Sequence, residues 1–316
     1  MTDYLYLLQT ARESWASFLT PLLYGISEFS YYCIIVIVFI LYMCVDKKKY
    51  TALLITYSVS NFLMSVIKLT FCVYRPWLRD TRLHPDNLAK ATATGYSFPS
   101  GHTTGATVFY SFFAYNEYRG RKRAGVIFVL ILLTILTAFS RNWLGAHTLA
   151  DVLTAIILGI GSIALIEYSL YLVDHKPNGD IVFTVACSIA SIASMIYFYT
   201  KSYPMDLGAD GQIICDPLKM QMDGWQSAGL AMGVTICWLI DRRFIHFTTD
   251  VSTKRKVVRG VIALILFLLL YMVLLKKLEH FSPLFGSFLR SFISMLICAG
   301  LYPAIFTTYE KKHLEM

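Results

Sequence analysis

Apolar stretches of about 17 to 25 residues recur along this chain, and each has the length that a helix needs to cross the hydrocarbon core of a membrane. Of the 316 residues, 56% are hydrophobic and 15% are charged, which is too little charge to cover the surface of a soluble domain. The sequence therefore predicts an all-α fold, a polytopic membrane helix bundle of about nine transmembrane helices. We place these helices at residues 30–45, 51–74, 102–118, 124–140, 147–173, 180–200, 226–240, 258–275 and 287–308.

The first 28 residues alternate apolar and polar positions and contain no unbroken apolar core of membrane-spanning length. Apolar side chains recur there at helical spacing, namely Tyr4, Leu7, Leu8, Ala11 and Trp15. This pattern predicts a helix that lies in the membrane interface, and a tenth, weakly hydrophobic span is the alternative. Because Asp3 and Glu13 stand where a signal peptide carries basic residues, we expect no cleavable signal.

The net charge of +8 could indicate a nucleic acid partner, but the distribution of the charges indicates membrane orientation instead. Lysine and arginine in short loops mark the cytoplasmic side of a membrane protein. They concentrate here in alternate connections, at residues 47–49, 119–123, 242–259 and 311–312. The opposite side then holds loop 75–101, the connection 141–146 and loop 201–225, which is acidic through Asp206, Asp210, Asp216 and Asp223. We expect membrane lipids as partners and no nucleic acid.

The seven cysteines do not form the pattern of a disulfide framework or of a metal site. Six of them lie in apolar stretches, namely Cys33, Cys44, Cys72, Cys187, Cys237 and Cys298. Cys215 lies in the polar loop 201–225 without an obvious partner. The six are typical of cysteine used as a small hydrophobic side chain.

Polar motifs gather at the non-cytoplasmic ends of three predicted spans. They are Lys68 followed by Arg75-Pro76, then Pro99-Ser100-Gly101-His102, then Ser140-Arg141 before His147 and Asp151. Each motif has an ordinary structural explanation, since a lysine at a helix end extends to the interface and a lone membrane histidine packs inside the bundle. Their coincidence at one membrane depth favours a common site.

The combined residue types are those of a phosphate site. Unpaired amides at the helix start that includes Ser100 and Gly101 bind an anion without side-chain charge. Three cations, Lys68, Arg75 and Arg141, are available to neutralise the oxygens of a transferring phosphoryl group.

Two histidines are candidates for the chemistry. His147 and Asp151 are four residues apart, so on one helix face the carboxylate can hold the imidazole in one tautomer. His102 is a second imidazole that can protonate a leaving oxygen. The residues alone do not decide which histidine attacks, although the neighbouring carboxylate favours His147.

With these three segments the sequence resembles the phosphatidic acid phosphatase type 2 superfamily, which includes glucose-6-phosphatases and vanadium haloperoxidases. The three-part signature is met without gaps between residues 60 and 155. The resemblance implies that His147 is the nucleophile that forms a phosphohistidine, that Asp151 orients it, and that His102 is the general acid. It implies a phosphate-binding group made of Lys68, Arg75, Ser100, Gly101 and Arg141. It also implies no metal and no other cofactor, and the motifs agree, because they hold no carboxylate cluster suited to magnesium.

The chain differs from the simple lipid phosphatases of this family, which have six spans. Here the last signature segment opens the fifth predicted span and about four spans follow, a layout similar to glucose-6-phosphatase and sphingosine-1-phosphate phosphatase. We therefore divide the chain into an interfacial segment 1–28, a phosphatase core 29–175 and additional transmembrane helices 176–316. Gly229 and Gly233 are typical of close helix packing within one chain rather than of a dimer contact. Loop 201–225 is long enough to form a lid or rim over the site.

The leading hypothesis is a membrane phosphatase that hydrolyses a phosphomonoester or pyrophosphate of a lipid on the non-cytoplasmic side. The candidate lipids are undecaprenyl pyrophosphate, phosphatidylglycerol phosphate, phosphatidic acid and a sphingoid base phosphate. A sugar phosphatase similar to glucose-6-phosphatase and a phosphotransferase are alternatives with the same chemistry. A non-catalytic transporter is the alternative from another class, and the filled catalytic positions argue against it.

Overall fold

The structure is a computed structural model that describes residues 2–14, 17–93, 95–208, 211 and 213–314. These residues form helices and connecting loops, and none of them forms a named β-strand. The chain divides into two compact units. Unit 1 contains Met1–Ile35, Leu63–Ala164 and Ser202–Met220, and unit 2 contains Val36–Phe62, Leu165–Lys201 and Gln221–Met316.

Seven helices in the described part of the chain are long and apolar enough to cross a membrane. They are Leu19–Val45, Lys47–Arg79, Ala124–Trp143, Leu149–His175, Gly179–Thr200, Thr253–Phe281 and Pro283–Lys312. They confirm the predicted all-α, multi-pass membrane fold. The two remaining predicted spans, 102–118 and 226–240, lie on the helices α7 (Gly101–Arg119) and α11 (Pro217–Ile240), which fall outside this apolar class.

The lower hydropathy of α7 has a physical explanation in its packing. Thr103, Thr104 and Thr107 are buried on this helix, and their hydroxyl groups bond within its first turns. Because these polar groups face protein rather than lipid, the helix does not need a uniformly apolar surface.

The first apolar span begins at Leu19 and not at residue 30 as predicted. It consists of α2 (Leu19–Glu28), the π-helical turn η1 (Phe29–Cys33), α3 (Ile34–Ile40) and the π-helical turn η2 (Leu41–Val45). The charge of Glu28 lowers the hydropathy of this segment, so the sequence places the start of the span too late. The side chain of Glu28 is only 16% exposed and lies against other polar groups. A charge that is placed in this way does not end a membrane helix.

The short helix α1 (Asp3–Ser14) precedes this span and is attached to the loops around the later motifs. The buried guanidinium of Arg12 donates to the carbonyls of Trp143, at 2.8 Å, and of His84. Gln9 accepts a bond from the amide of His84 at 2.7 Å, and Leu7 is 69% exposed. Trp15, which belongs to the predicted interfacial pattern, lies outside the described residues.

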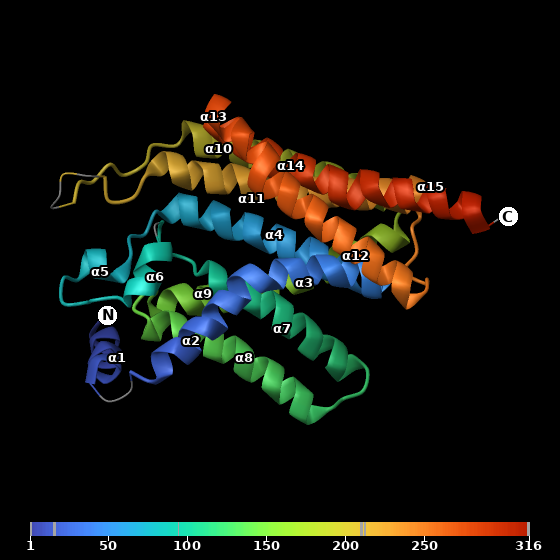
Figure 1. Cartoon of the computed structure of the whole chain (residues 1–316). Coiled ribbons are helices and arrows are strands. Elements are labelled where there is room, and N and C mark those ends of the chain that lie inside the picture. The colour runs from blue at the N-terminus through green and yellow to red at the C-terminus, as the bar shows by residue number, and fades with distance from the viewer. Residues whose placement is uncertain (1, 15–16, 94, 209–210, 212, 315–316) are drawn as a thin grey trace. The chain divides into compact units, whose positions relative to one another are not determined.

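Unit 1 contains all the helix ends that bear the motifs. Its elements are α1, α2, η1, α5 (Pro76–Arg79), α6 (Asn87–Thr92), α7 and α8 (Ala124–Trp143), with the end of α4 (Lys47–Phe71) and the start of α9 (Leu149–His175). Residues 120–123 connect α7 to α8, and the two helices lie side by side and antiparallel (Figure 1). Both α1 and α2 pack against α8.

Unit 2 contains most of the later helices. Its elements are most of α3, η2, the start of α4, the end of α9, α10 (Gly179–Thr200), α11, η3 (Asp241–Ile245), α12 (Thr253–Leu268), η4 (Leu269–Leu274), η5 (Leu275–Lys277), α13 (Leu278–Phe281), α14 (Pro283–Met295), η6 (Leu296–Leu301) and α15 (Tyr302–Leu314).

Two glycines of α11 lie close to α14. A methyl group added to Gly229 would lie 2.5 Å from the carbonyl oxygen of Phe288. One added to Gly233 would lie 2.9 Å from Cβ of Met295. The structure thus confirms that these glycines serve helix packing within the chain, between α11 and α14.

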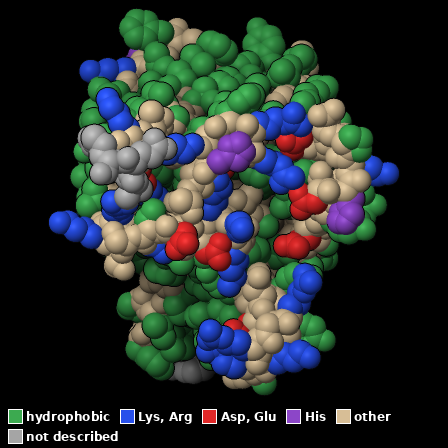
Figure 2. Space-filling model, turned by 90° about the vertical axis from the view of Figure 1, so that its right-hand side faces the viewer, with side chains coloured by type: hydrophobic (Ala, Val, Ile, Leu, Met, Phe, Trp, Pro, Cys, Tyr) green, Lys and Arg blue, Asp and Glu red, His purple; other side chains and the backbone are tan. Residues whose placement is uncertain are grey.

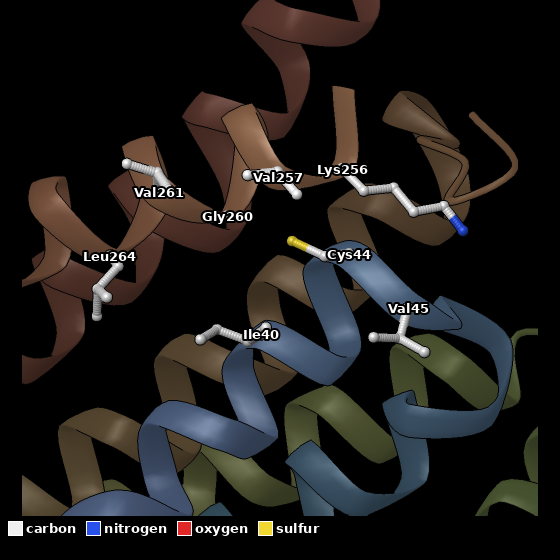
Figure 3. A pocket seen from close by; sticks show the side chains of 8 residues that line it. All are labelled: Ile40, Cys44, Val45, Lys256, Val257, Gly260, Val261 and Leu264. Atoms are coloured by element: carbon white, nitrogen blue, oxygen red, sulfur yellow. The ribbon is translucent and has the colours of Figure 1, made fainter. Parts of the chain in front are cut away.

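Unit 2 also contains an apolar cavity of about 360 Å³ between η2 and α12. Cys44 points towards Gly260 across it, and a methyl group added to Gly260 would lie 2.8 Å from the sulfur (Figure 3). Lys256 is the charged residue of its lining. The other lining residues are apolar apart from Cys44 and Gly260, as in ordinary lipid-facing packing, and none of the motif residues lines this cavity.

Hydrophobic side chains are exposed along the spanning helices, as expected for contact with lipid. Phe128 on α8, Ile157 on α9 and Ile189 on α10 are examples. On the face shown in Figure 2, hydrophobic side chains cover one region while lysine, arginine and acidic side chains gather in another. The protein is therefore a multi-pass membrane protein.

Candidate active site

The eight residues singled out in the sequence lie at helix ends of unit 1. Lys68 is in the last turn of α4, Arg75 immediately precedes α5, Ser100 caps α7, and Gly101 and His102 begin it. Arg141 is in the last turn of α8, and Asp151 is in the first turn of α9. His147 precedes α9, which starts at Leu149, so the expectation that His147 and Asp151 share a helix face is wrong.

The loop position of His147 still brings its ring to Asp151. Nδ1 of His147 lies 3.5 Å from Oδ2 of Asp151, and both side chains are 2% exposed. The turn is stabilised by its own backbone, since the amides of Ala146 and His147 donate to the carbonyl of Arg141 at 3.0 and 3.2 Å. Asn142 adds a bond from its side-chain amide to the carbonyl of His147 at 2.9 Å.

A serine that the sequence reading missed completes this pair. The hydroxyl of Ser97 donates to Oδ2 of Asp151 at 2.6 Å and lies 3.3 Å from Nδ1 of His147. The amide of Thr148 donates to the same carboxylate oxygen at 2.7 Å. Two donors therefore fix the carboxylate, and the carboxylate together with Ser97 fixes the ring. Ser97 lies outside the recognisable motifs, so no sequence pattern predicts its role.

The other ring nitrogen of His147 faces a cation. Nη1 of Arg75 lies 2.9 Å from Nε2 of His147 and also donates to the carbonyl of Ala146 at 3.0 Å. Nε of Arg75 donates to the carbonyl of Gly95 at 2.7 Å. Because a guanidinium only donates, Nε2 is the acceptor, and the proton of the neutral ring is on Nδ1, towards Asp151.

The charge state of His147 follows from these surroundings. Burial lowers the pKa of His147 well below the usual value of 6.5, and the positive charges of Arg75 and Arg141 lower it further. The hydrogen bond and the negative charge of Asp151 act in the opposite direction. The imidazole is therefore neutral at pH 7, with a lone pair on Nε2.

The start of α7 has the geometry of an anion site. Ser100 is fully buried, and its hydroxyl accepts from the hydroxyl of Thr103 at 3.0 Å, while its amide donates to the carbonyl of Asp151 at 3.2 Å. The following amides, of Gly101 and His102, belong to the first turn, which has no intrahelical acceptors. Lys68 lies near this segment and donates from Nζ to the carbonyl of Tyr96 at 3.0 Å.

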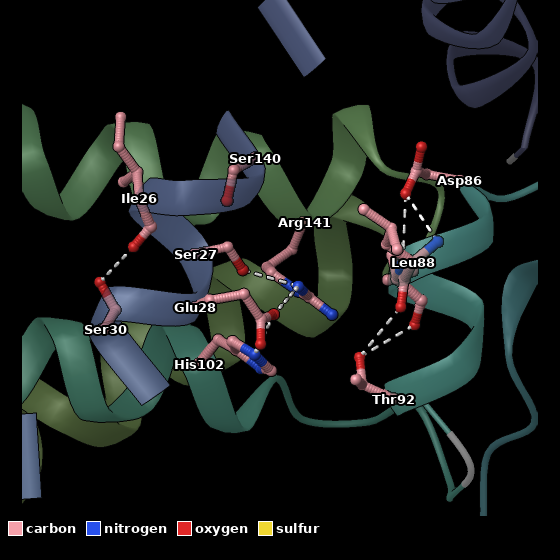
Figure 4. Close-up of polar contacts among 12 residues, drawn as sticks. Ile26, Ser27, Glu28, Ser30, Asp86, Leu88, Thr92, His102, Ser140 and Arg141 are labelled. Carbon is pink, nitrogen blue, oxygen red and sulfur yellow. Dashed lines mark hydrogen bonds and ion pairs between the residues drawn. The ribbon is translucent and has the colours of Figure 1, made fainter. Parts of the chain in front are cut away.

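Arg141 and His102 meet at a carboxylate from the first span. Nη1 of Arg141 donates to the hydroxyl of Ser27 at 2.6 Å and lies 3.9 Å from Oε1 of Glu28. Nε2 of His102 lies 3.4 Å from the same oxygen (Figure 4). Within the described part of the chain, Nε of Arg141, Nε2 of His102 and Oε1 of Glu28 are buried without a hydrogen-bond partner. Glu28 is the second residue that the sequence reading missed.

A pocket of about 170 Å³ lies beside Arg75 in unit 1. Trp77 and Lys90 from loop 75–101 line it, together with Ile214 and Cys215 from loop 201–225. Burial raises the pKa of the Cys215 thiol to about 11, so this cysteine stays protonated and is not a competing nucleophile.

Loop 201–225 is attached next to this pocket. Tyr74 donates its hydroxyl to Asp206 at 2.8 Å, and Asp223 lies in α11 rather than in the loop. Asp210 lies outside the described residues.

Among the residues that the structure describes, no three histidine, cysteine, aspartate or glutamate side chains are grouped so as to hold a metal ion.

Comparisons with known proteins bear on the family of the chain. The profile of the PAP2 superfamily matches residues 49–175, and the profile of the PAP2 superfamily phosphatase, transmembrane extension, matches residues 225–313. Phosphatidylglycerophosphatase B of Bacillus subtilis (strain 168) is 29% identical over 93 residues, which cover 28% of this chain and 45% of that protein. No solved structure matches the chain significantly. The chain, with its signature residues at one set of helix ends and both profiles along its length, belongs to the PAP2 superfamily.

Proposed function

We propose that the protein is an integral-membrane, metal-independent phosphatase that hydrolyses a phosphomonoester or pyrophosphate of a lipid on the non-cytoplasmic side. The observation on which this proposal rests is the environment of His147. Its Nδ1 lies against Asp151 and Ser97, and its Nε2 faces Arg75. A neutral ring in one tautomer, with its lone pair beside a cation, is suited to attack on phosphorus.

In the first step, the guanidinium of Arg75 donates to the phosphate instead of to Nε2, and the freed Nε2 lone pair of His147 forms a bond to phosphorus as the ester P–O bond breaks. Arg75 and Arg141 neutralise the phosphoryl oxygens, with Lys68 and the amides at the start of α7. His102 gives a proton to the leaving oxygen. The products of this step are the phosphohistidine and the free alcohol, or a lipid monophosphate when the substrate is a pyrophosphate. Asp151 stabilises the positive charge that develops on the ring.

In the second step, water attacks the phosphorus of the phosphohistidine. His102 accepts a proton from this water, the P–N bond breaks, and the lone pair returns to Nε2 of His147. Inorganic phosphate is released, and both histidines regain their initial protonation states.

The outer surface of α9 supports a lipid substrate. Asp151 points into the site, whereas Leu149, Leu153 and Ile157 are 50%, 48% and 72% exposed. These three residues are spaced by four and share one helix face. An apolar surface therefore begins at the level of the site, so a phosphorylated head group could reach His147 while its acyl chains stay in the bilayer.

The test is phosphate release by the purified protein in detergent with EDTA. We expect release from phosphatidylglycerol phosphate and phosphatidic acid at rates well above those with glucose 6-phosphate, and inhibition by vanadate, which resembles the transition state. Radiolabelled substrate should leave an alkali-stable, acid-labile phosphate on the wild type and none on His147→Ala.

His175→Ala is the matched control, because His175 is an exposed histidine at the other end of α9. This variant should keep the wild-type rate and the covalent label. Equal rates for wild type and His147→Ala would contradict the proposal. Faster release from glucose 6-phosphate than from either lipid would contradict the lipid assignment alone.

A further inference from the structure

The first span supplies side chains to the site that belong to none of the three motifs. Ser27 accepts a bond from Arg141 at 2.6 Å, and Oε1 of Glu28 lies 3.4 Å from Nε2 of His102. The ring of Tyr31 stacks on the ring of His102, with centroids 4.5 Å apart and planes at 21°. Glu28 ends α2, and Tyr31 lies in the π-helical turn η1 that follows. Such turns are frequent at functional sites, because they change which side chains share a face.

The carboxylate of Glu28 lies closer to His102 than to Arg141. Its Oε1 is 3.4 Å from the imidazole and 3.9 Å from Nη1 of Arg141, which already donates to Ser27. Figure 4 shows the carboxylate between the two groups. Buried carboxylates are costly unless they are paired or hydrogen-bonded, so a purely structural glutamate should have a well-made partner. Among the described residues, Oε1 makes no hydrogen bond and has only the long ion-pair contacts to His102 and Arg141.

From this geometry we propose that Glu28 is the positioning residue of the general acid, holding the proton and the orientation of His102 as Asp151 holds those of His147. This inference rests on the phosphatase function proposed above. The contact of 3.4 Å is long, and catalytic hydrogen bonds of this kind often tighten only when substrate is bound.

The two histidines have different nearest charged partners, although the positive charge of Arg141 acts on both. The ring that attacks must be neutral, and it faces the guanidinium of Arg75. The ring that donates must be protonated, and it faces the carboxylate of Glu28. When the P–O bond breaks, the Nδ1 proton of His102 moves to the leaving oxygen, while the Nε2 proton stays with the carboxylate of Glu28. In the second step the proton of the attacking water returns to His102. Neighbours that separate the proton affinities of two groups in this way are a recurrent feature of acid–base catalysis.

The test compares esters that differ in their need for a general acid. The leaving group of p-nitrophenyl phosphate departs without protonation, whereas the glycerol oxygen of dioctanoyl phosphatidic acid needs a proton. For Glu28→Gln we expect kcat/KM to fall about 10- to 100-fold with phosphatidic acid and less than about 3-fold with p-nitrophenyl phosphate. A glutamate needed only for folding would lower both values together.

A double-mutant cycle separates action through His102 from a direct effect. In the His102→Ala background, Glu28→Gln should add no further loss with phosphatidic acid. Glu28→Asp keeps the carboxylate, so it should recover part of the phosphatidic acid activity, and it replaces Glu28→Gln if that variant does not run as a single species in size exclusion. Glu13→Gln, the same change at an exposed position on α1, should leave both rates unchanged.

The outcomes are distinct. Equal losses with the two esters, or additive losses in the double mutant, would overturn the role of Glu28 while leaving the phosphatase function intact. Absence of phosphate release from both esters by the wild type would contradict the phosphatase function itself.

Discussion

Ser97 connects the two groups on which the proposed nucleophile depends. Its hydroxyl donates to the same oxygen of Asp151 that faces Nδ1 of His147. Without this donor, the carboxylate would keep the amide of Thr148 and could rotate away from the ring. The contribution of Ser97 should therefore appear in the reacting state more than in substrate binding.

We predict that Ser97→Ala lowers kcat about 10- to 150-fold with little change in KM, as expected for the loss of about 1.5–3 kcal/mol from a hydrogen bond to a charged group. Steady-state phosphate release measures both constants. Ser162→Ala removes a serine hydroxyl on α9 that bonds to the carbonyl of Leu158 instead, and should keep wild-type kinetics. A rise in KM at constant kcat would show that Ser97 acts in binding.

The lowered pKa of His147 predicts the direction in which stability depends on pH. Below about pH 6.5 the unfolded chain takes up a proton at this ring that the folded chain does not, so stability is lost as pH falls. The loss is up to about 1.4 kcal/mol per pH unit. Between pH 7.5 and 5.5 the apparent unfolding midpoint of the wild type should fall further than that of His147→Gln. Parallel curves would show that the ring is accessible to protons in the folded state.

Residue types and spacing were enough to predict that the motif residues gather, because all of them lie at or next to helix ends of unit 1. They could not reveal Glu28 or Ser97. Glu28 lies 74 residues before His102 in the sequence, and only the packing of the first span on α7 and α8 brings the two side chains together. Ser97 lies in a loop, where neither helical period nor hydropathy predicts a side-chain direction.

At the level of helices, the spans predicted at 102–118 and 226–240 do lie on helices, α7 and α11, but these two fall outside the apolar class of the other seven. Hydropathy indicates which helices suit contact with lipid. A helix such as α7, which has a buried threonine face, is therefore less apolar than the other spans although it begins at the site. The same reasoning explains the early start of the first span, where Glu28 is buried against His102 and not exposed to lipid. The glycine spacing on α11 did predict a close helix contact.

Gly229→Ala should destabilise the protein by about 1–3 kcal/mol, the usual cost of overpacking a well-filled contact. The carbonyl of Phe288 that the new methyl group would meet belongs to the backbone of α14 and cannot rotate away. Thermal unfolding in detergent measures the effect. Gly161→Ala on α9 is the control, since a methyl group there meets nothing within 4 Å, and alanine favours the helix. Equal midpoints for both variants would contradict the close contact.

For the whole molecule, the positive loops predict the side on which the site faces. Arg121 lies in the turn between α7 and α8, and Asn87 begins α6, in the loop that leads from Arg75 to the start of α7. Because α7 separates these two loops, they should lie on opposite sides of the membrane.

In intact cells, a membrane-impermeant maleimide should label Asn87→Cys and should not label Arg121→Cys until the membrane is permeabilised. Both positions are exposed, so the difference reports the side of the membrane rather than burial. The wild type gives the background from its own cysteines. The reverse pattern would place the site on the cytoplasmic side.

The order in which unit 1 is assembled from the chain has a consequence for biosynthesis. A nascent chain that has emerged from the ribosome as far as α9 already contains every motif residue, together with Glu28 and Ser97. It still lacks Ser202–Met220, the segment of unit 1 that supplies Ile214 and Cys215 to the pocket beside Arg75. Membrane insertion of α10 must therefore come before the pocket beside Arg75 is complete, and in a chain stalled on the ribosome after α9 this pocket would lack Ile214 and Cys215.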